Sequence, residues 1–189
     1  MSASSSRDLR AVIEDILEHD FVSASDTVPA SELSISGNGF FIVRDAGTNE
    51  HYATQCGHFR LDAEGHLVTE SGAHVQGRVD GSFSKVGDLR ISGAEASTSS
   101  CSSMLCYSID SWGKIMVYLA DGTSYLRGQV MLQNFRDPEA LVHKGDGLYS
   151  NLSAAGPLPG LAAPRTNGLG AIRSCLPQIY RGEPTCWTN

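Results

Sequence analysis

Short stretches of alternating apolar and polar residues, separated by turns, dominate the chain from residue 33 onward. Each stretch is rich in β-branched and aromatic residues, and a cluster of turn-forming residues follows about every 8–12 residues, as in a β-sandwich or barrel. The stretches include ELSIS, GFFIV, GHFRL, HLVT, DLRIS, KIMVYL and SYLRGQVMLQNF. The pattern predicts a mainly β fold with a single sandwich- or barrel-like domain.

Helical periodicity occurs only near the N-terminus. It predicts a short amphipathic helix over about residues 7–19, followed by a linker that contains Pro29. The apolar face of this helix must be buried either on the β domain or on another copy of the chain. Its side chains are therefore candidate assembly contacts: Leu9, Val12, Ile13, Ile16 and Leu17.

Turn residues divide the remainder into three predicted regions. Residues 1–31 form the helix and linker, residues 32–152 the β domain, and residues 153–189 an irregular tail that packs along or beside it. Within the β domain, Asp62 and Gly65 supply the turn of the clearest hairpin, FRLDAEGHLVTE, and IMVYLADGTSYLRG forms a second. The small, Ser-rich residues 93–106 are predicted to form an exposed loop.

Charge and composition exclude several classes of partner. The 189 residues are 41% hydrophobic and 19% charged, with a net charge of −7 and most of the acidic excess in the first half. No basic stripe is present, so neither nucleic acid nor an anionic membrane surface is an expected partner. No apolar run is long enough to insert into a membrane, and the first twenty residues lack the apolar core of a cleavable signal peptide.

The cysteines do not form a recognisable framework. There are five, at positions 56, 101, 106, 175 and 186, with no CxxC pair. An odd number without that spacing favours free thiols over a disulfide scaffold or a zinc ribbon. Pairing of Cys175 with Cys186, or of Cys101 with Cys106, remains open.

A Gly-x-Gly motif, Gly37-Asn38-Gly39, invites comparison with a phosphate-binding loop. A dinucleotide fingerprint requires a third glycine and a helix that opens behind the loop. Here Phe40 and Phe41 follow instead, in a strand-like context. We interpret the motif as a turn that leads into a buried aromatic strand.

No catalytic or metal-binding signature is evident. Histidines and Cys56 cluster between residues 51 and 74, and alternation places Cys56 and His58 on the wetter face of a strand. Arg60 lies on that same face and would repel a cation, while a metal site needs three or four convergent ligands. We therefore expect no metal, no cofactor, no small-molecule substrate and no enzymatic activity.

Residues 33–77 resemble the segment that follows the N-terminal helix in bacterial flagellar rod and hook proteins. That family combines Gly-(Asn/Asp)-Gly-Phe-Phe with Gly-x-Phe and Leu-Asp-x-x-Gly-x-Leu-Val-Thr. The matching positions are Gly37, Asn38, Gly39, Phe40, Phe41, Tyr52, Gly57, Phe59, Asp62, Gly65, Leu67, Val68, Thr69, Gly72, Val75 and Gly77.

A second stretch, residues 128–157, is similar to the family's Gly-Gln-(Ile/Val)-x-Leu-x-x-Phe-x-(Asn/Asp)-Pro-x-x-Leu run. Its matches are Gly128, Gln129, Leu132, Phe135, Asp137, Pro138, Leu141, Gly145, Leu148, Tyr149 and Gly156. Residues 167–178 look like the lead-in to the family's C-terminal helix. Several motifs in the family's order are far more specific than one Gly-x-Gly.

The departures concern the two terminal helices through which the family assembles. The predicted N-terminal helix is short and acidic and lacks the family's Asn-rich motif, while Gly182 and Pro184 preclude a long C-terminal helix. The expectation is a family β domain with both assembly helices missing or replaced.

The resemblance implies a structural component of the flagellar basal body, rod or hook. It would be exported without a cleavable signal and would assemble with itself or with other axial proteins. One alternative is a divergent paralogue that kept the β fold, lost polymerisation and serves as a binding or adhesion module, in which case it is cytoplasmic. A less favoured alternative is a small metal-dependent enzyme that uses Cys56 and His58.

Overall fold

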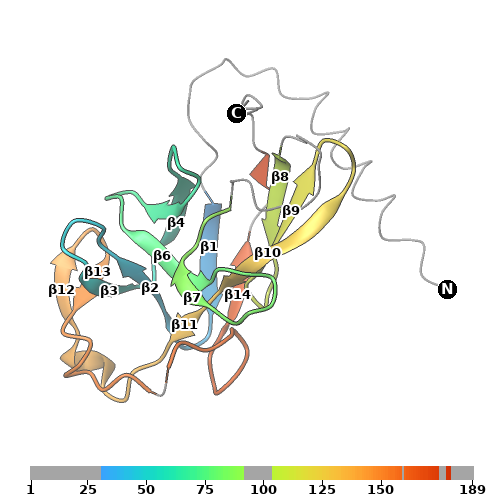
Figure 1. The fold of residues 1–189 in the computed structure, drawn as a ribbon. Coiled ribbons are helices and arrows are strands. Elements are labelled where there is room, and N and C mark those ends of the chain that lie inside the picture. The colour runs from blue at the N-terminus through green and yellow to red at the C-terminus, as the bar shows by residue number, and fades with distance from the viewer. Residues whose placement is uncertain (1–30, 92–103, 159, 175–177, 180–189) are drawn as a thin grey trace.

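The computed structural model describes residues 31–91, 104–158, 160–174 and 178–179, and these form a mainly antiparallel β structure (Figure 1). Their only helical element is the short 3₁₀ helix η1 (Pro138–Ala140). The predicted helix over residues 7–19 and its five apolar side chains lie outside the described residues. The mainly β prediction is confirmed, and it follows from the alternation and turns of the sequence.

The described strands are short, as the closely spaced turns require. They are β1 (Ser31–Ser36), β2 (Phe40–Arg44), β3 (His51–Thr54), β4 (Gly57–Leu61), β5 (Leu67–Thr69), β6 (His74–Arg78), β7 (Val86–Asp88), β8 (Met104–Ile109), β9 (Lys114–Leu119), β10 (Ser124–Val130), β11 (Leu132–Gln133), β12 (Val142–Gly145), β13 (Leu148–Ser150), β14 (Ala171–Ser174) and β15 (Gln178–Ile179).

One path of hydrogen-bonded strands runs through the molecule in the order β12-β13-β3-β2-β6-β10-β9-β8-β15. Branches leave this path: β1 pairs with both β4 and β14, β5 joins β4 to β6, and β7 pairs with β6. Both predicted hairpins are present, as β4–β5 and β9–β10. Strand β6 thus links the strands around β2 to those around β10, and Figure 1 shows it between them.

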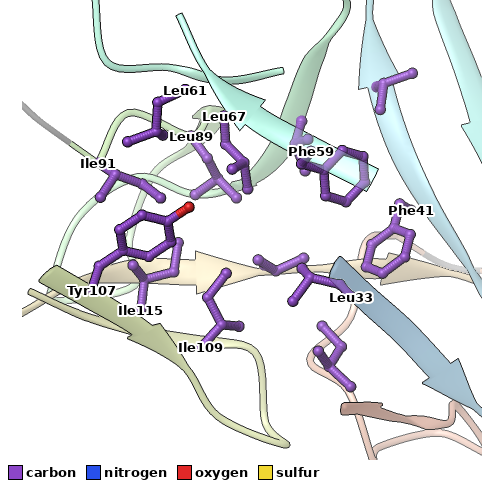
Figure 2. Packing of buried hydrophobic residues seen from close by; sticks show 14 of the residues in the cluster. Leu33, Phe41, Phe59, Leu61, Leu67, Leu89, Ile91, Tyr107, Ile109 and Ile115 are labelled. Atoms are coloured by element: carbon purple, nitrogen blue, oxygen red, sulfur yellow. The ribbon is translucent and has the colours of Figure 1, made fainter. Parts of the chain in front are cut away.

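Strand β2 is buried on both faces because it separates two hydrophobic clusters. Phe41 and Val43 point into the larger cluster, and Phe40 and Ile42 into the smaller one. Figure 2 shows the larger cluster, where Phe41 lies near Phe59. Alternation along a strand produces this division.

Two segments differ from the sequence-based expectation. The predicted loop over residues 93–106 ends earlier than expected, because Met104 begins β8 and Cys106 is buried in it. The region after residue 153, expected to be irregular, contains β14, which pairs with β1 and buries Ile172. Strand β14 pairs with β1, which is distant in the sequence, whereas β8 pairs with the adjacent β9 but begins in a stretch of small and mixed residues. Local composition therefore reveals neither start.

Candidate functional site

The Gly37-Asn38-Gly39 motif joins the start of the β domain to its C-terminal segment. Asn38 forms a parallel bridge with Leu169, and its carbonyl accepts a hydrogen bond from the Gly170 N–H at 2.7 Å. The two motif glycines have φ of +122° and +124°, a region that side chains with a β carbon rarely adopt. Strand β2 follows directly, where a phosphate loop would require a helix.

Aromatic residues from both sequence motifs meet around β2. The Phe40 ring contacts Phe135 and Tyr149 edge-on, with centroids 5.5 and 6.0 Å apart. On the opposite face, Phe41 contacts Phe59 edge-on at 5.1 Å. The motif residues therefore build the core rather than a binding cleft, and edge-to-face pairs add about 0.5–1.5 kcal/mol each beyond area burial.

The remaining motif residues also support the backbone. Gln129 donates its side-chain amide to the Trp112 carbonyl at 2.7 Å, and Pro138 opens η1. Leu148 lies against the larger cluster, and Gly57 is opposite Leu33 where β4 meets β1. Each of these positions serves packing or chain direction.

The β4–β5 turn is held by Asp62. Its Oδ1 accepts a hydrogen bond from the His66 backbone N–H at 2.7 Å, and its carbonyl accepts one from the Gly65 N–H at 3.0 Å. Gly65 has φ of +83°, as the turn requires. The predicted turn residues therefore occupy the turn, and Asp62 keeps its second oxygen, Oδ2, directed outward from it.

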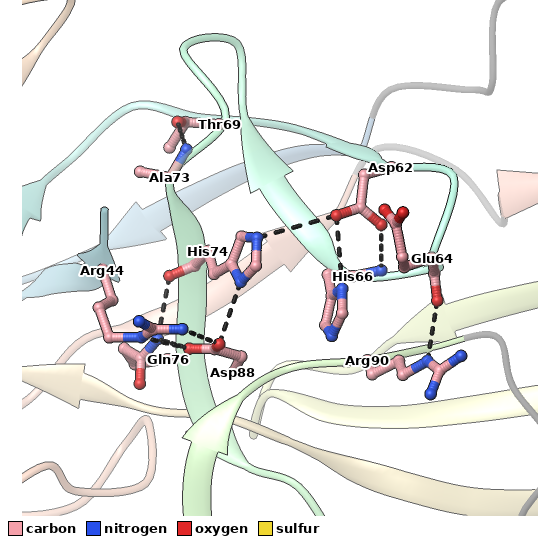
Figure 3. A network of polar contacts seen from close by, with 10 residues as sticks. All are labelled: Arg44, Asp62, Glu64, His66, Thr69, Ala73, His74, Gln76, Asp88 and Arg90. Carbon is pink, nitrogen blue, oxygen red and sulfur yellow. Dashed lines mark hydrogen bonds and ion pairs between the residues drawn. The ribbon is translucent and has the colours of Figure 1, made fainter. Parts of the chain in front are cut away.

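Asp62 Oδ2 faces two histidine rings (Figure 3). It lies 3.4 Å from His66 Nδ1 and 3.8 Å from His74 Nε2. The two rings are stacked, with centroids 4.8 Å apart and planes 13° from parallel. Among the described residues, this is the group of three potential metal-ligating side chains whose ligand atoms lie within 4.8 Å of one another.

A second carboxylate, Asp88 on β7, fixes the far side of His74. Asp88 Oδ2 lies 3.0 Å from His74 Nδ1, and Asp88 also accepts hydrogen bonds from Gln76 and Arg44. Burial opposes ionisation of Asp88, but the hydrogen bonds from Arg44, Gln76 and His74 outweigh it and hold its pKa well below the usual range. Asp88 is therefore ionised at neutral pH and accepts from His74.

We expect Asp88→Asn to destabilise the domain by about 2 kcal/mol at pH 7, because Arg44 and His74 lose a charged acceptor. The depressed pKa means that the unfolded chain takes up the proton first. The stabilisation is therefore complete above the unfolded-state pKa of about 4 and is lost as pH falls below it. Urea unfolding from pH 7 to pH 2.5 should show the two proteins converging in acid.

The matched control is Glu139→Gln, at an exposed carboxylate in η1. Its stability should stay within about 0.5 kcal/mol of the parent at every pH. An Asp88→Asn difference that persists unchanged below pH 3 would show that the carboxylate charge is not the source of the stabilisation.

Comparison with known proteins identifies this β structure. Residues 34–117 match the family model "Flagellar hook protein FlgE/F/G D1 domain". The chain belongs to the flagellar hook and rod protein family. The match begins in β1 and ends in β9, so it contains the Gly37-Asn38-Gly39 motif, the β4–β5 hairpin, and Asp62, His66 and His74.

Named relatives are similar over a longer span of this hook/rod chain. It is 28% identical to the flagellar basal-body rod protein FlgG of Bacillus subtilis over 156 residues, which is 82% of the chain and 53% of that protein. It is 29% identical to FlgG of Buchnera aphidicola subsp. Baizongia pistaciae over 156 residues, which is 82% of the chain and 52% of that protein. The flagellar hook protein FlgE of Rhizobium meliloti is 49% identical over 51 residues, 27% of the chain and 12% of that protein.

The hook/rod chain spans about half the length of the rod proteins that it matches. No helix among its described residues is long and apolar enough to cross a bilayer.

Among the described residues, Cys56 and His58 are not in the group of three side chains whose potential ligand atoms converge within 4.8 Å. Both are exposed beside a cavity of about 380 Å³ whose lining includes Glu70 and Asp146. The expected single strand through these residues is in fact two, because β3 ends at Thr54, which is buried, and β4 begins at Gly57. Alternation nevertheless holds within β4, where His58 and Arg60 are exposed.

We expect Cys56 to be alkylated more than about tenfold faster than Cys106 in the native protein. Both are free thiols, but Cys106 is buried in β8, and burial raises the pKa of its thiol. Peptide-resolved iodoacetamide labelling measures the two rates, and urea should equalise them. Equal rates without denaturant would contradict the burial of β8.

Sequence reasoning missed the proximity of Asp62, His66 and His74, although a signal was present. Asp62 and His66 flank the hairpin turn, and β5 pairs with β6 so that Val68 is opposite His74. Residues two apart share a face of a strand, which places His66 and His74 on the same side. The β5–β6 pairing was the missing piece of information.

Proposed function

We propose that this chain is a structural, non-catalytic component of the bacterial flagellar rod or hook. The observation that carries the proposal is the match of residues 34–117 to the hook-protein D1 domain, with similarity to rod proteins over 82% of the chain. The described β structure fits this role, since its motif residues are used for packing and turns. The chain would act by presenting a rigid β surface to its neighbours.

The partners in this proposal are other copies of the chain or other axial proteins of the flagellum. The site of action is the basal body or hook, reached by an export route that does not use a cleavable signal peptide. Nucleic acid, membrane insertion and a small-molecule substrate have no part in it.

The edge strand β12 is the described surface that best suits such a contact. It lies at one end of the strand path and pairs only with β13 among the described strands. Val142 at its start is 52% exposed, an uncommon feature for a large apolar side chain on an open edge. Trp112 offers a second exposed contact at the β8–β9 turn, where Arg165 lies over its ring at 4.8 Å.

Ile13→Glu tests whether the N-terminal apolar residues are assembly contacts. If they bury against another copy, the charge should shift the purified chain from assemblies to monomer while leaving the far-UV circular dichroism unchanged. Light scattering after size exclusion, with negative-stain electron microscopy, measures this change.

The control is Glu14→Gln, a neighbouring substitution off the predicted apolar stripe. A parent protein that stays monomeric at all concentrations, with or without purified axial proteins, contradicts the structural role. That outcome supports the alternative of a paralogue that kept the β fold and serves as a binding module.

A further inference from the structure

We propose that Asp62, His66 and His74 form a binding site for one divalent transition-metal ion of the zinc class. The ligand atoms are Asp62 Oδ2, His66 Nδ1 and His74 Nε2, which converge between the β4–β5 turn and β6 (Figure 3). The site stands apart from the proposed flagellar role and concerns the integrity of the β domain itself.

The three ligand atoms do not satisfy one another by hydrogen bonding. Separations of 3.4 and 3.8 Å from Asp62 Oδ2 to the ring nitrogens are longer than good N–H···O hydrogen bonds. His66 Nδ1 is buried and has no hydrogen-bond partner among the described residues. A buried, unpaired polar atom beside a carboxylate oxygen is costly unless a cation joins them.

The protonation pattern leaves His74 Nε2 available as a ligand. The Asp88 carboxylate can only accept, so the nitrogen of His74 that it contacts, Nδ1, carries the hydrogen. In the neutral ring the lone pair is then on Nε2, which faces Asp62. A carboxylate that orients a ligating histidine through its other nitrogen is the usual support for a protein-bound metal.

The donor set and spacing suit zinc. Two imidazoles and one carboxylate leave a fourth tetrahedral position for water. Metal–ligand bonds of about 2.0–2.1 Å place tetrahedral ligand atoms about 3.3 Å apart, close to the 3.4 and 3.8 Å found here. Because the stacked rings are nearly parallel, binding requires rotation of the His66 ring, whose Nδ1 no hydrogen bond restrains.

The surrounding charges are compatible with a cation. Arg44 is paired with Asp88, and the Arg90 Nε donates to the Glu64 carbonyl at 2.8 Å. Asp62 itself is anchored through Oδ1 to the His66 backbone N–H, which holds the carboxylate with Oδ2 toward the two rings. A bound ion would fasten the β4–β5 hairpin to β6.

The test uses the full chain, stripped with EDTA and dialysed under reducing conditions. Calorimetric titration with Zn²⁺ should show one site per chain, and Co²⁺ should give the visible absorption of a tetrahedral N/O site. Zinc at one hundred times its dissociation constant should raise the thermal midpoint by about 5–10 °C.

Two variants and a control define the ligands. Asp62→Asn keeps an oxygen for the turn hydrogen bond but removes the charge, and His66→Gln removes the unpaired nitrogen. Each should weaken zinc binding at least about tenfold. His51→Gln, at an exposed histidine on β3, should leave the affinity unchanged.

Failure of the parent protein to bind zinc would overturn the proposal. Binding that survives in both Asp62→Asn and His66→Gln would also overturn it. An intense near-ultraviolet band of cobalt thiolate would do the same, because it would assign the ion to cysteines. Circular dichroism confirms that each variant is folded, so a loss of binding in either folded variant is decisive.

Discussion

Replacing Gly57 by alanine is expected to destabilise the β domain by about 3 kcal/mol or more. A β carbon at this position would lie 1.9 Å from the carbonyl oxygen of Leu33 and 2.6 Å from its carbonyl carbon. These are backbone atoms of β1, which no side-chain rotation can move aside. The added methyl group must therefore separate β4 from β1, at the register where Gly57 pairs with Leu33.

Urea unfolding measures this effect as a fall in the midpoint at an unchanged slope. Gly87→Ala is the matched control, because its β carbon would meet only Val79 Cγ1, at 3.7 Å. Neither glycine has a positive φ, so the comparison isolates the close approach of the strands. We expect Gly87→Ala to stay within about 0.5 kcal/mol of the parent. Equal effects at the two positions would contradict the described β1–β4 contact.

Replacing Phe41 by alanine should cost about 3–5 kcal/mol, the range found for large-to-small substitutions at buried aromatic positions. Phe41 is fully buried on β2 and contacts the equally buried Phe59 at a ring-centroid distance of 5.1 Å. The cost combines lost apolar burial with a cavity between β2 and β4. Thermal and urea unfolding of the purified variant measure it.

A double-mutant cycle with Phe59→Ala sharpens the measurement. The two substitutions should be non-additive by about 0.5–1.5 kcal/mol, because they share one edge-to-face contact. Phe83→Ala is the control: this half-buried turn residue has a φ of +58°, and its ring lies 5.9 Å from the Arg78 guanidinium, outside the two hydrophobic clusters. Its cost should be below about 1 kcal/mol. Fully additive effects of Phe41→Ala and Phe59→Ala would argue against the ring contact.

These two variants also bear on the proposed flagellar role. An axial protein that presents a rigid β surface needs its strands held in one arrangement, and Gly57 and Phe41 both act on β4. Loss of assembly in either variant therefore reports on the domain's fold, whereas Ile13→Glu addresses the contact itself.

The local pattern of residues was sufficient to predict elements that are determined by residues close together in the sequence. The β4–β5 hairpin follows from alternation and from Asp62 and Gly65, and the aromatic strand β2 follows from its apolar run. The same residues carry the resemblance to the hook and rod family, which the comparisons confirm. In these places the residues that determine the structure are neighbours in sequence.

Contacts between distant segments were beyond the reach of local pattern. Strand β14 forms because Ile172 lies opposite Ile35 on β1, and the other side of β8 pairs with β15, where Tyr107 is opposite Gln178. A short stretch of small or mixed residues reads as loop until its partner strand is known, because strand stability comes from packing and pairing more than from propensity.

The sequence by itself determined that this chain is mainly β, where its clearest hairpins turn, and to which family it belongs, since each depends on residue order along short segments. Only the tertiary structure decided that Asp62, His66 and His74 share one small volume with Asp88 behind them. It also decided that Gly57 must be a glycine, because the obstructing atoms belong to another strand. The physical reason is the same in both cases: strand pairing brings together residues whose proximity no local pattern encodes.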